Sequence, residues 1–425
     1  MGAEKKMPEV RFKEFSDSWK SSSLNKNIEV LDGDRGHNYP STGDLKEQGH
    51  TLFLSASNVT KRGFEFNSKQ YITLEKSQSM GNGKLALNDI VLTSRGSIGH
   101  IAWYDEIVKQ KVPYARINSG MLILRSNDSM CPSIVSQYLK SPIGAKKIDL
   151  ISFGSAQPQL TKASVSKLKI TIPENKTEQS LVGSYFQKLD TLINQHQQKH
   201  DKFSNLKKAM LEKMFPKAGE TVPEIRFDGF TGNWTTTSLS KIAHVIDPHP
   251  SHRAPDAVAN GVPFIGIGDV AENGHVDFKN VRIVPYHIYG EHRQRYQVEV
   301  GDFAYGRVAS IGKIIDLSSN VDREYTYSPT MAIVKPVTLY SPYLKGYMNT
   351  SVFKGRVDNK TTGSTRKSLG VQDFRELPVC FPEQQEEQIK IGDYFQKLGL
   401  LINQHKHQIT KLKNIKQACL DKMFV

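Results

Sequence analysis

Two long stretches of the chain, residues 179–215 and 388–424, repeat apolar side chains every three or four positions. Neither stretch contains proline, and both are rich in Leu, Lys and Gln, which favour helices. The spacing predicts two helices, each about 55 Å long with one apolar stripe. Because a small domain cannot cover such a stripe, we expect the helices to pair as an antiparallel coiled coil. The expected seam residues are Leu189, Ile193, His196, Leu206, Leu398, Ile402, His405 and Leu412.

Two histidines, His196 and His405, interrupt the apolar stripes near the helix midpoints, next to glutamines. One interpretation is a metal or proton site. The preferred interpretation is a polar layer that fixes the register of the helix pair.

The two helices belong to an internal repeat. Residues 183–196 and 392–405 are identical at 11 of 14 positions, and Pro8-Glu-Val-Arg-Phe12 reappears as Pro223-Glu-Ile-Arg-Phe227. The chain is therefore a tandem duplication of about 210 residues, in which each unit joins a divergent globular part to a better preserved tail. The expected organisation is a first domain at 1–176, a helical spacer at 177–218, a second domain at 219–383 and a second helical spacer at 384–425.

The divergent parts alternate short apolar segments with Gly, Asn and Ser clusters, a pattern typical of strands and turns. Strands are expected at 51–54, 89–92, 120–124 and 168–172, and helices of about three turns at 133–147 and 342–357. The fold class is therefore expected to be α+β, with two α/β domains separated by two long antiparallel coiled-coil helices in a pseudo-twofold tandem repeat.

Charge and composition narrow the possible functions. The chain has 425 residues, a formal net charge of +14 and a pI of about 9.4, which favours a polyanionic partner such as nucleic acid. No run of about 18 apolar residues and no secretory start is present, so we expect a cytoplasmic protein without a membrane partner. Three widely separated cysteines support neither a disulfide framework nor a zinc site.

Several motifs resemble catalytic or cofactor sites, but each lacks a residue or a spacing that the site requires. Gly306 to Lys313 resembles a phosphate-binding loop but has one residue too many between its glycines and Ile314 in place of Ser or Thr. Phe264 to Gly268 resembles the glycine turn that binds S-adenosylmethionine, but its glycines have no counterpart in the first repeat. The Asn/Asp-Pro-Pro-aromatic motif of adenine methylation is also absent from the sequence. Pro173 to Lys176 contains the Glu-x-Lys part of a nuclease site, but its position before a helix predicts a turn and a helix cap. His244, His249 and His252 could suggest a metal site, but Pro248 and Pro250 interrupt any regular face of ligands. We expect no catalytic, cofactor or metal site.

The residues that remain to be explained are basic and polar side chains that could bind nucleic acid. Residues 1–176 hold 25 basic and 17 acidic side chains, whereas residues 219–383 hold 18 of each. Glycine-rich loops in both domains carry hydroxyls for phosphates and Arg or Gln side chains that can read guanine or adenine edges. The expected DNA-binding residues are Lys61, Arg62, Arg95, Ser97, Gln157, Gln159 and Lys162 in the first domain, and Arg307, Ser310, Thr365, Arg366 and Lys367 in the second.

The whole chain resembles the DNA-specificity subunit of type I restriction-modification systems. The resemblance is carried by the paired Pro-Glu-Val/Ile-Arg-Phe starts with Trp19 and Trp234, and by the Tyr-Phe-Gln-Lys-Leu helices that end in Lys-Met-Phe. It implies two target-recognition domains that read a split DNA site and a spacing set by the helices. It also implies partner modification subunits, expected to be two in number, which use S-adenosylmethionine, and restriction subunits that use ATP and Mg. A fused methyltransferase or nuclease, or a scaffold that binds only proteins, is the alternative.

Overall fold

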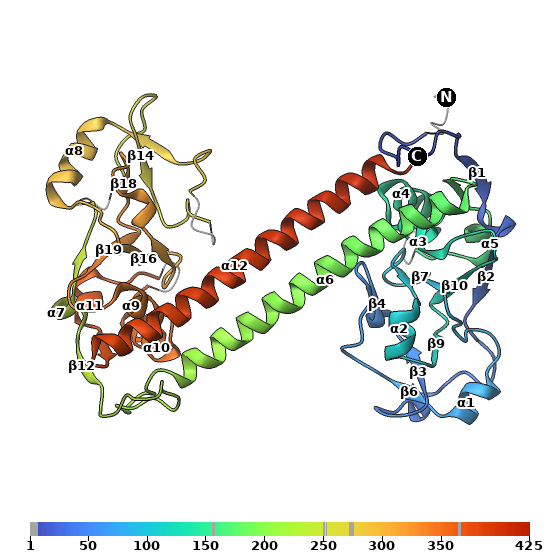
Figure 1. The fold of residues 1–425 in the computed structure, drawn as a ribbon, viewed down its shortest axis with the longest axis horizontal. Helices are drawn as coiled ribbons and strands as arrows, with labels where there is room; N and C mark the ends of the chain where they lie inside the picture. The colour runs from blue at the N-terminus through green and yellow to red at the C-terminus, as the bar shows by residue number, and fades with distance from the viewer. Residues whose placement is uncertain (1–6, 155–157, 250, 252, 272–275, 364–366) are drawn as a thin grey trace. The chain divides into compact units, whose positions relative to one another are not determined.

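The computed structural model describes residues 7–154, 158–249, 251, 253–271, 276–363 and 367–425. The chain forms two compact units, residues 1–195 with 408–425 and residues 196–407. Each unit contains one globular domain and part of two long helices, α6 (Lys176–Lys213) and α12 (Gln385–Lys422) (Figure 1). Both helices have 38 residues and begin and end within three residues of the predicted ranges.

The first domain is built on a four-stranded antiparallel sheet. Its central strands are apolar over most of their length because they are covered on both faces: Ile90 and Leu92 face one hydrophobic cluster, whereas Val91 and Ile123 face another. The strand order is β2 (Ile28–Asp32), β10 (Met121–Ser126), β7 (Ile90–Thr93) and β8 (Ile101–Trp103).

Smaller sheets and short helices complete this domain. The small sheets are β6 (Tyr71–Ile72) with β3 (Thr51–Leu54) and β9 (Ala115–Ile117), β1 (Lys20–Ser23) with β11 (Lys169–Ile172), and β4 (Val59–Thr60) with β5 (Gly63–Phe64). The helices are η1 (Leu24–Lys26), η2 (Thr42–Asp44), η3 (Ala56–Asn58), α1 (Leu74–Ser79), α2 (Glu106–Lys111), α3 (Pro132–Lys140), α4 (Pro142–Ile151) and α5 (Lys162–Ser166).

The second domain repeats this topology in its main sheet, as a tandem duplication predicts. Its four-stranded sheet has the order β13 (Ala243–Ile246), β19 (Met331–Pro336), β16 (Phe303–Gly306) and β17 (Ile314–Asp316). Its small sheets are β15 (Arg282–Val284) with β14 (Val262–Ile265) and β18 (Thr326–Tyr327), and β12 (Thr235–Ser238) with β20 (Pro378–Phe381). The helices are α7 (Leu239–Ile242), α8 (Tyr286–Arg295), η4 (Ser318–Asn320), α9 (Ser341–Tyr347), α10 (Ser351–Lys360) and α11 (Val371–Glu376).

The expectation of one helix at 133–147, and of one at 342–357, was wrong because each range is split in two. Ser141 ends α3 and caps α4: its hydroxyl accepts from the Gly144 amide at 3.1 Å, and Pro142 follows at the first helical position. In the second domain α9 ends at Tyr347, and Thr350 caps α10 by accepting from the Phe353 amide at 3.2 Å. A capping hydroxyl inside an apolar run therefore marks a helix start that periodicity alone does not reveal.

The paired sequence motifs at the start of each repeat anchor the long helices. Arg11 forms a two-pronged ion pair with buried Glu178 of α6, with nitrogen–oxygen distances of 2.6 and 2.8 Å. Trp19 donates its indole hydrogen to the same carboxylate at 3.1 Å. Arg226 forms the same two-pronged ion pair with Glu387 of α12, with nitrogen–oxygen distances of 2.7 and 2.8 Å. Since removing one partner would strand a buried charge, these motifs hold the helix starts in place.

The C-terminal end of each long helix packs in the unit that contains the start of the other long helix. Phe424, after α12, packs on Trp19, Tyr138 and Phe186 of the first unit, and its ring stacks on Phe186 at 5.7 Å. In the second unit, Phe215 stacks in the same way on Phe395, at 5.5 Å. In each unit the start of one helix therefore lies beside the end of the other, which confirms the antiparallel pairing.

The histidine layer lies in the second unit. The Nδ1 atoms of His196 and His405 are 2.9 Å apart, and the Phe203 ring stacks on His405. Desolvation, followed by the neighbouring His196, lowers the pKa of His405. Among the described residues no group of three or more His, Cys, Asp or Glu side chains could hold a metal ion. Of the other expected seam residues, Leu189 and Leu398 are buried, and Ile193, Leu206, Ile402 and Leu412 are half-buried.

Candidate nucleic-acid interface

Two of the expected DNA-binding residues of the first domain, Arg95 and Gln159, are cross-strand neighbours although 64 positions separate them. Gln159 pairs on its other side with Phe153, through backbone hydrogen bonds of 2.9 and 3.1 Å. Directly opposed residues of antiparallel strands point to the same face. Phe153, Gln159 and Arg95 therefore form one row of side chains, which we call the first row. Sequence reasoning missed Phe153, because nothing local distinguishes an exposed ring from a core one.

Backbone hydrogen bonds fix the position of the first row. The amides of Ser94 and Arg95 both donate to the carbonyl of Gly120, at 2.8 and 3.2 Å, and the Leu160 amide donates to the carbonyl of Ser94 at 2.9 Å. Gly96 has a φ of 71°, a conformation that glycine adopts without strain. Arg95 thus stands at the base of a tight turn with an exposed side chain.

The remaining first-domain candidates lie near this row in the chain. Ser97 is exposed in the turn after Arg95, and its carbonyl accepts from the Thr93 hydroxyl. Lys162 is exposed at the first position of α5, one residue after the cap Thr161. Gln157 lies outside the described residues.

The first unit has a groove that is lined by lysines. It has a volume of about 640 Å³ and is lined by Lys61, Lys140, Lys413 and Lys416, with Asp149 as its acidic residue. Lys416 also reaches Asp190, at 2.6 Å. Burial lowers the pKa of Lys140 to about 8. The excess of ammonium groups gives this groove the positive charge that attracts anions.

Lys61 and Arg62 form the exposed turn between β4 and β5. Lys61 lines the lysine groove, whereas Arg62 pairs with Glu65 at 2.9 Å. The two side chains therefore differ in the charge that they can offer to a phosphate.

The second domain has a matching row with different chemistry. Ser368 pairs with Thr362 on one side and with Val308 on the other, and this second row occupies the same place in the repeat as the first. Thr362 and Ser368 exchange backbone hydrogen bonds of 2.9 and 3.0 Å. The backbone frame is thus shared, but the second row has no arginine, glutamine or aromatic side chain.

The sequence candidates of the second domain fall in different places. Ser310 and Lys367 are exposed, and Ser310 follows Ala309, which has a φ of 62°. Thr365 and Arg366 lie outside the described residues.

Arg307 is not placed to contact DNA, which corrects its assignment from the sequence. Its side chain is only 6% exposed, and its guanidinium donates to the carbonyls of Leu369 and Pro329 at 3.0 and 2.9 Å and pairs with Asp247 at 3.2 Å. These contacts tie the turn of the second row to two neighbouring loops. Buried Ser94 takes the matching place in the first domain, so comparison of the two repeats does not indicate that this arginine turns inward.

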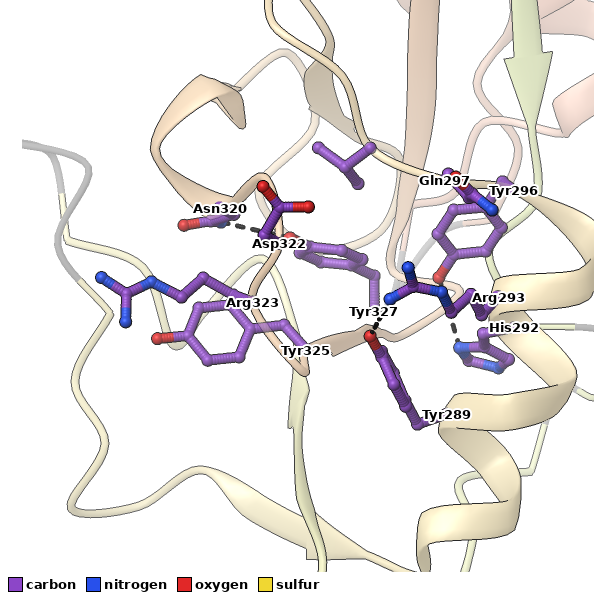
Figure 2. A pocket seen from close by; sticks show the side chains of 11 residues that line it. Tyr289, His292, Arg293, Tyr296, Gln297, Asn320, Asp322, Arg323, Tyr325 and Tyr327 are labelled. Carbon is purple, nitrogen blue, oxygen red and sulfur yellow. Dashed lines mark hydrogen bonds between the residues drawn. The ribbon is translucent and has the colours of Figure 1, made fainter.

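A small pocket in the second domain lies between α8 and residues 320–327 (Figure 2). Tyr289, Arg293 and Tyr325 are among its lining residues, and Arg293 donates to the Tyr289 hydroxyl at 2.6 Å. Its volume of about 60 Å³ is well below the several hundred Å³ typical of a nucleotide-sized ligand site. Water is the occupant that fits this volume.

His292, which lines this pocket, belongs to a buried histidine network. His249 and His292 are nearly inaccessible, and their rings are joined by an Nδ1–Nε2 contact of 2.9 Å. His292 Nδ1 lies 3.2 Å from the Tyr296 hydroxyl, and His249 Nε2 lies 3.3 Å from the Arg253 carbonyl. One neutral tautomer of each ring satisfies every contact. Burial lowers the pKa of His292 to about 4.

We expect the second domain to lose stability as the pH falls from about 6.5 to 4. In this range the unfolded chain binds a proton at His292 that the folded domain excludes, so the free energy of unfolding should fall by up to about 3 kcal/mol. Urea unfolding measured between pH 4.5 and 7.5 tests this. His292→Gln should flatten the pH profile, whereas His287→Gln, an exposed residue of the same helix, should leave it unchanged. A wild-type profile as flat as that of His292→Gln would contradict the prediction.

Known proteins resemble the chain in sequence and in fold. Residues 17–203 match the family described as type I restriction modification DNA specificity domain. No curated protein has significant sequence similarity to the chain. The type I restriction-modification system S subunit from M. genitalium has a similar structure, with a TM-score of 0.61, 14% identity and 99% of each chain covered. This match extends the similarity in fold to the whole chain.

Two further solved structures are similar over most of their length. The HsdS subunit from Thermoanaerobacter tengcongensis has a TM-score of 0.40 and 15% identity, covering 96% of each chain. A second structure, which concerns complex assembly and conformational transition of the type I R-M system, has a TM-score of 0.45 and 16% identity, covering 96% of this chain and 97% of that one. Separately, none of the helices in the described part of the chain is long and apolar enough to cross a membrane.

Proposed function

From its similarity to the type I restriction modification DNA specificity family through residues 17–203, we infer that this chain reads DNA sequence for a type I restriction-modification complex. It recognises an asymmetric bipartite site and directs adenine methylation or ATP-dependent cleavage by partner subunits. We take residues 1–176 and 219–383 as its two target-recognition domains, with 177–218 and 384–425 as spacers. The structural observation that supports this inference is the pair of rows held on one repeated backbone frame.

The chemistry of the two rows supports an asymmetric site. Arg95 can donate two hydrogen bonds to guanine O6 and N7, and Gln159 can pair with adenine N6 and N7. Val308, Ser368 and Thr362 present only methyl groups and hydroxyls in the corresponding places. Two rows with different donors and acceptors would select different bases, so the two half-sites should differ. Ser97, Lys162, Ser310 and Lys367, and from the sequence Gln157, Thr365 and Arg366, complete the proposed DNA-binding set.

The reaction itself is assigned to partner subunits. Modification subunits, two in our proposal, would supply S-adenosylmethionine chemistry, and restriction subunits would supply ATP-driven translocation and Mg-dependent cleavage. The purified chain alone should neither transfer a labelled methyl group to DNA nor cleave DNA with magnesium. Turnover by the chain alone would favour the alternative of a fused methyltransferase or nuclease.

The central test is sequencing of methylated adenines in the host genome with and without this gene. We expect one bipartite motif to lose methylation when the gene is deleted and to regain it when the gene is restored. Selective binding of that motif by the assembled complex in moderate salt would separate this function from a scaffold that binds only proteins. Binding with no preference for the motif would refute the proposal.

The lysine groove predicts a measurable salt dependence. Replacing Lys61 by Gln should weaken binding to all DNA sequences, and removal of one phosphate contact should lower the slope of log K against log salt by about 0.9. Arg62→Gln should change the slope less, because Glu65 already offsets its charge. Lys69→Gln, an exposed lysine outside the groove, is the control and should leave the slope unchanged. Equal slopes for Lys61→Gln and wild type would remove Lys61 from the interface.

A further inference from the structure

The exposed ring of Phe153 is not needed for the backbone pairing of Phe153 with Gln159. Phe153 is 48% exposed, in a protein with large buried cores. Thr362 holds the same place in the second domain, and it exchanges backbone hydrogen bonds of similar length with Ser368. An aromatic side chain that is half exposed does not contribute the full hydrophobic stabilisation that burial would provide. The ring is therefore available to a partner that the first domain binds and the second domain does not.

The neighbours of Phe153 in the first row indicate the chemistry of that partner. Gln159 lies next to the ring, and Arg95 lies on the far side of Gln159. An amide and a guanidinium beside an apolar group match the major groove, where adenine and guanine edges accept or donate hydrogen bonds and thymine presents a methyl group. The excess of 25 basic over 17 acidic residues in this domain favours DNA over an apolar protein surface.

The dimensions of the row also fit a DNA duplex. Neighbouring strands lie about 4.8 Å apart, so the backbones of Phe153 and Arg95 should be separated by about 10 Å. Successive base pairs rise by about 3.4 Å, so this distance equals about three base-pair steps. Three side chains in such a row can each reach a different base pair of one half-site.

We propose that Phe153 is a third base-reading residue of the first domain and contacts the C5-methyl group of a thymine in the major groove. This inference rests on the proposed function. The thymine lies closer to the base pair read by Gln159 than to the one read by Arg95. The second domain has the shorter Thr362 in the place of this ring, so we expect the ring to contribute to one half-site only.

Uracil-substituted duplexes test the contact, because deoxyuridine differs from thymidine only by the missing methyl group. The full chain, assembled with its modification subunits, is titrated with duplexes in which each thymine of the methylated motif is replaced by uracil in turn. We expect the affinity of the wild type to fall about fourfold at one thymine of the first half-site, which corresponds to about 0.8 kcal/mol for one buried carbon group. The variant Phe153→Ala should bind the thymine and uracil duplexes equally at that position.

Control variants separate this contact from effects on folding or assembly. Phe153→Thr copies the residue of the second domain, and Leu150→Ala removes a neighbouring apolar side chain that is 74% exposed but is not in the row. Phe153→Thr should reduce the discrimination between thymine and uracil because its side chain is much shorter, whereas Leu150→Ala should keep it. Arg95→Ala should relax a different base pair, two or three steps from the sensitive thymine.

The outcomes distinguish failure of this inference from failure of the proposed function. If the wild-type complex does not prefer its motif to random DNA, the proposed function fails. If it prefers the motif but Phe153→Ala keeps the wild-type response to uracil, the thymine contact is refuted. A fall in the affinity of Phe153→Ala that is equal for thymine and uracil duplexes at every position, with wild-type discrimination retained, would instead indicate a wedge between bases or a protein contact and would also overturn the proposal.

Discussion

Inserting two residues after Gln197 is expected to abolish activity, whereas inserting four is expected to lengthen the gap between the half-sites. Two helical residues rotate everything beyond them by about 200° and four by about 400°, which is close to one full turn. After two residues, Phe203 and Leu206 would leave the seam, and Phe215 would no longer face Phe395. Without these apolar contacts the helix pair should not assemble.

The four-residue insertion keeps the apolar stripe and adds about 6 Å to α6. If α6 spaces the two target-recognition domains, as proposed, the gap in the methylated motif should grow by one or two base pairs while both half-sites stay the same. Sequencing of methylated adenines in cells that carry each insertion measures the gap directly. An unchanged gap with full activity after four residues would refute the role of the helix as a ruler, and full activity after two would refute the seam.

Exchanging residues 219–383 for the equivalent domain of a relative should change one half of the methylated motif and leave the other half intact. The reason is that the two rows lie in different domains and share no residue. The methylated motif of cells carrying the hybrid gene measures the result. A change in both halves, or in neither, would contradict the modular organisation.

The contacts at the domain boundary decide which relatives are suitable for this exchange. Phe215 lies before the boundary but packs on Trp234, and Glu387 lies after it but pairs with Arg226. A donor domain that lacks the arginine would leave Glu387 buried without its ion pair, at a cost of about 3–5 kcal/mol. A hybrid that keeps Arg226 and Trp234 therefore tests specificity, whereas Arg226→Ala in the native chain provides the folding control.

The sequence identified part of the candidate interface because exposed polar side chains in glycine-rich turns follow local rules. Arg95 and Gln159 satisfied those rules, and the structure places them side by side. Arg307 satisfied the same rules but turns inward, because Asp247 and two carbonyls of distant loops receive its guanidinium. Phe153 satisfied none of them, since an aromatic residue in a divergent loop reads as part of the core. Whether a side chain is exposed depends on neighbours that are far away along the chain.

The sequence by itself determined the two long helices, the duplication and the family resemblance, because each follows from the spacing of residues along the chain or from comparison of the chain with itself. Only the tertiary structure decided that each helix end completes the unit of the other repeat, with Phe424 against Phe186 and Phe215 against Phe395. It also decided the strand register that aligns Phe153, Gln159 and Arg95 in one row. The physical reason is that helical periodicity is a local property with a period of 3.6 residues, whereas strand register and core packing join residues whose separation in sequence carries no information about their contact.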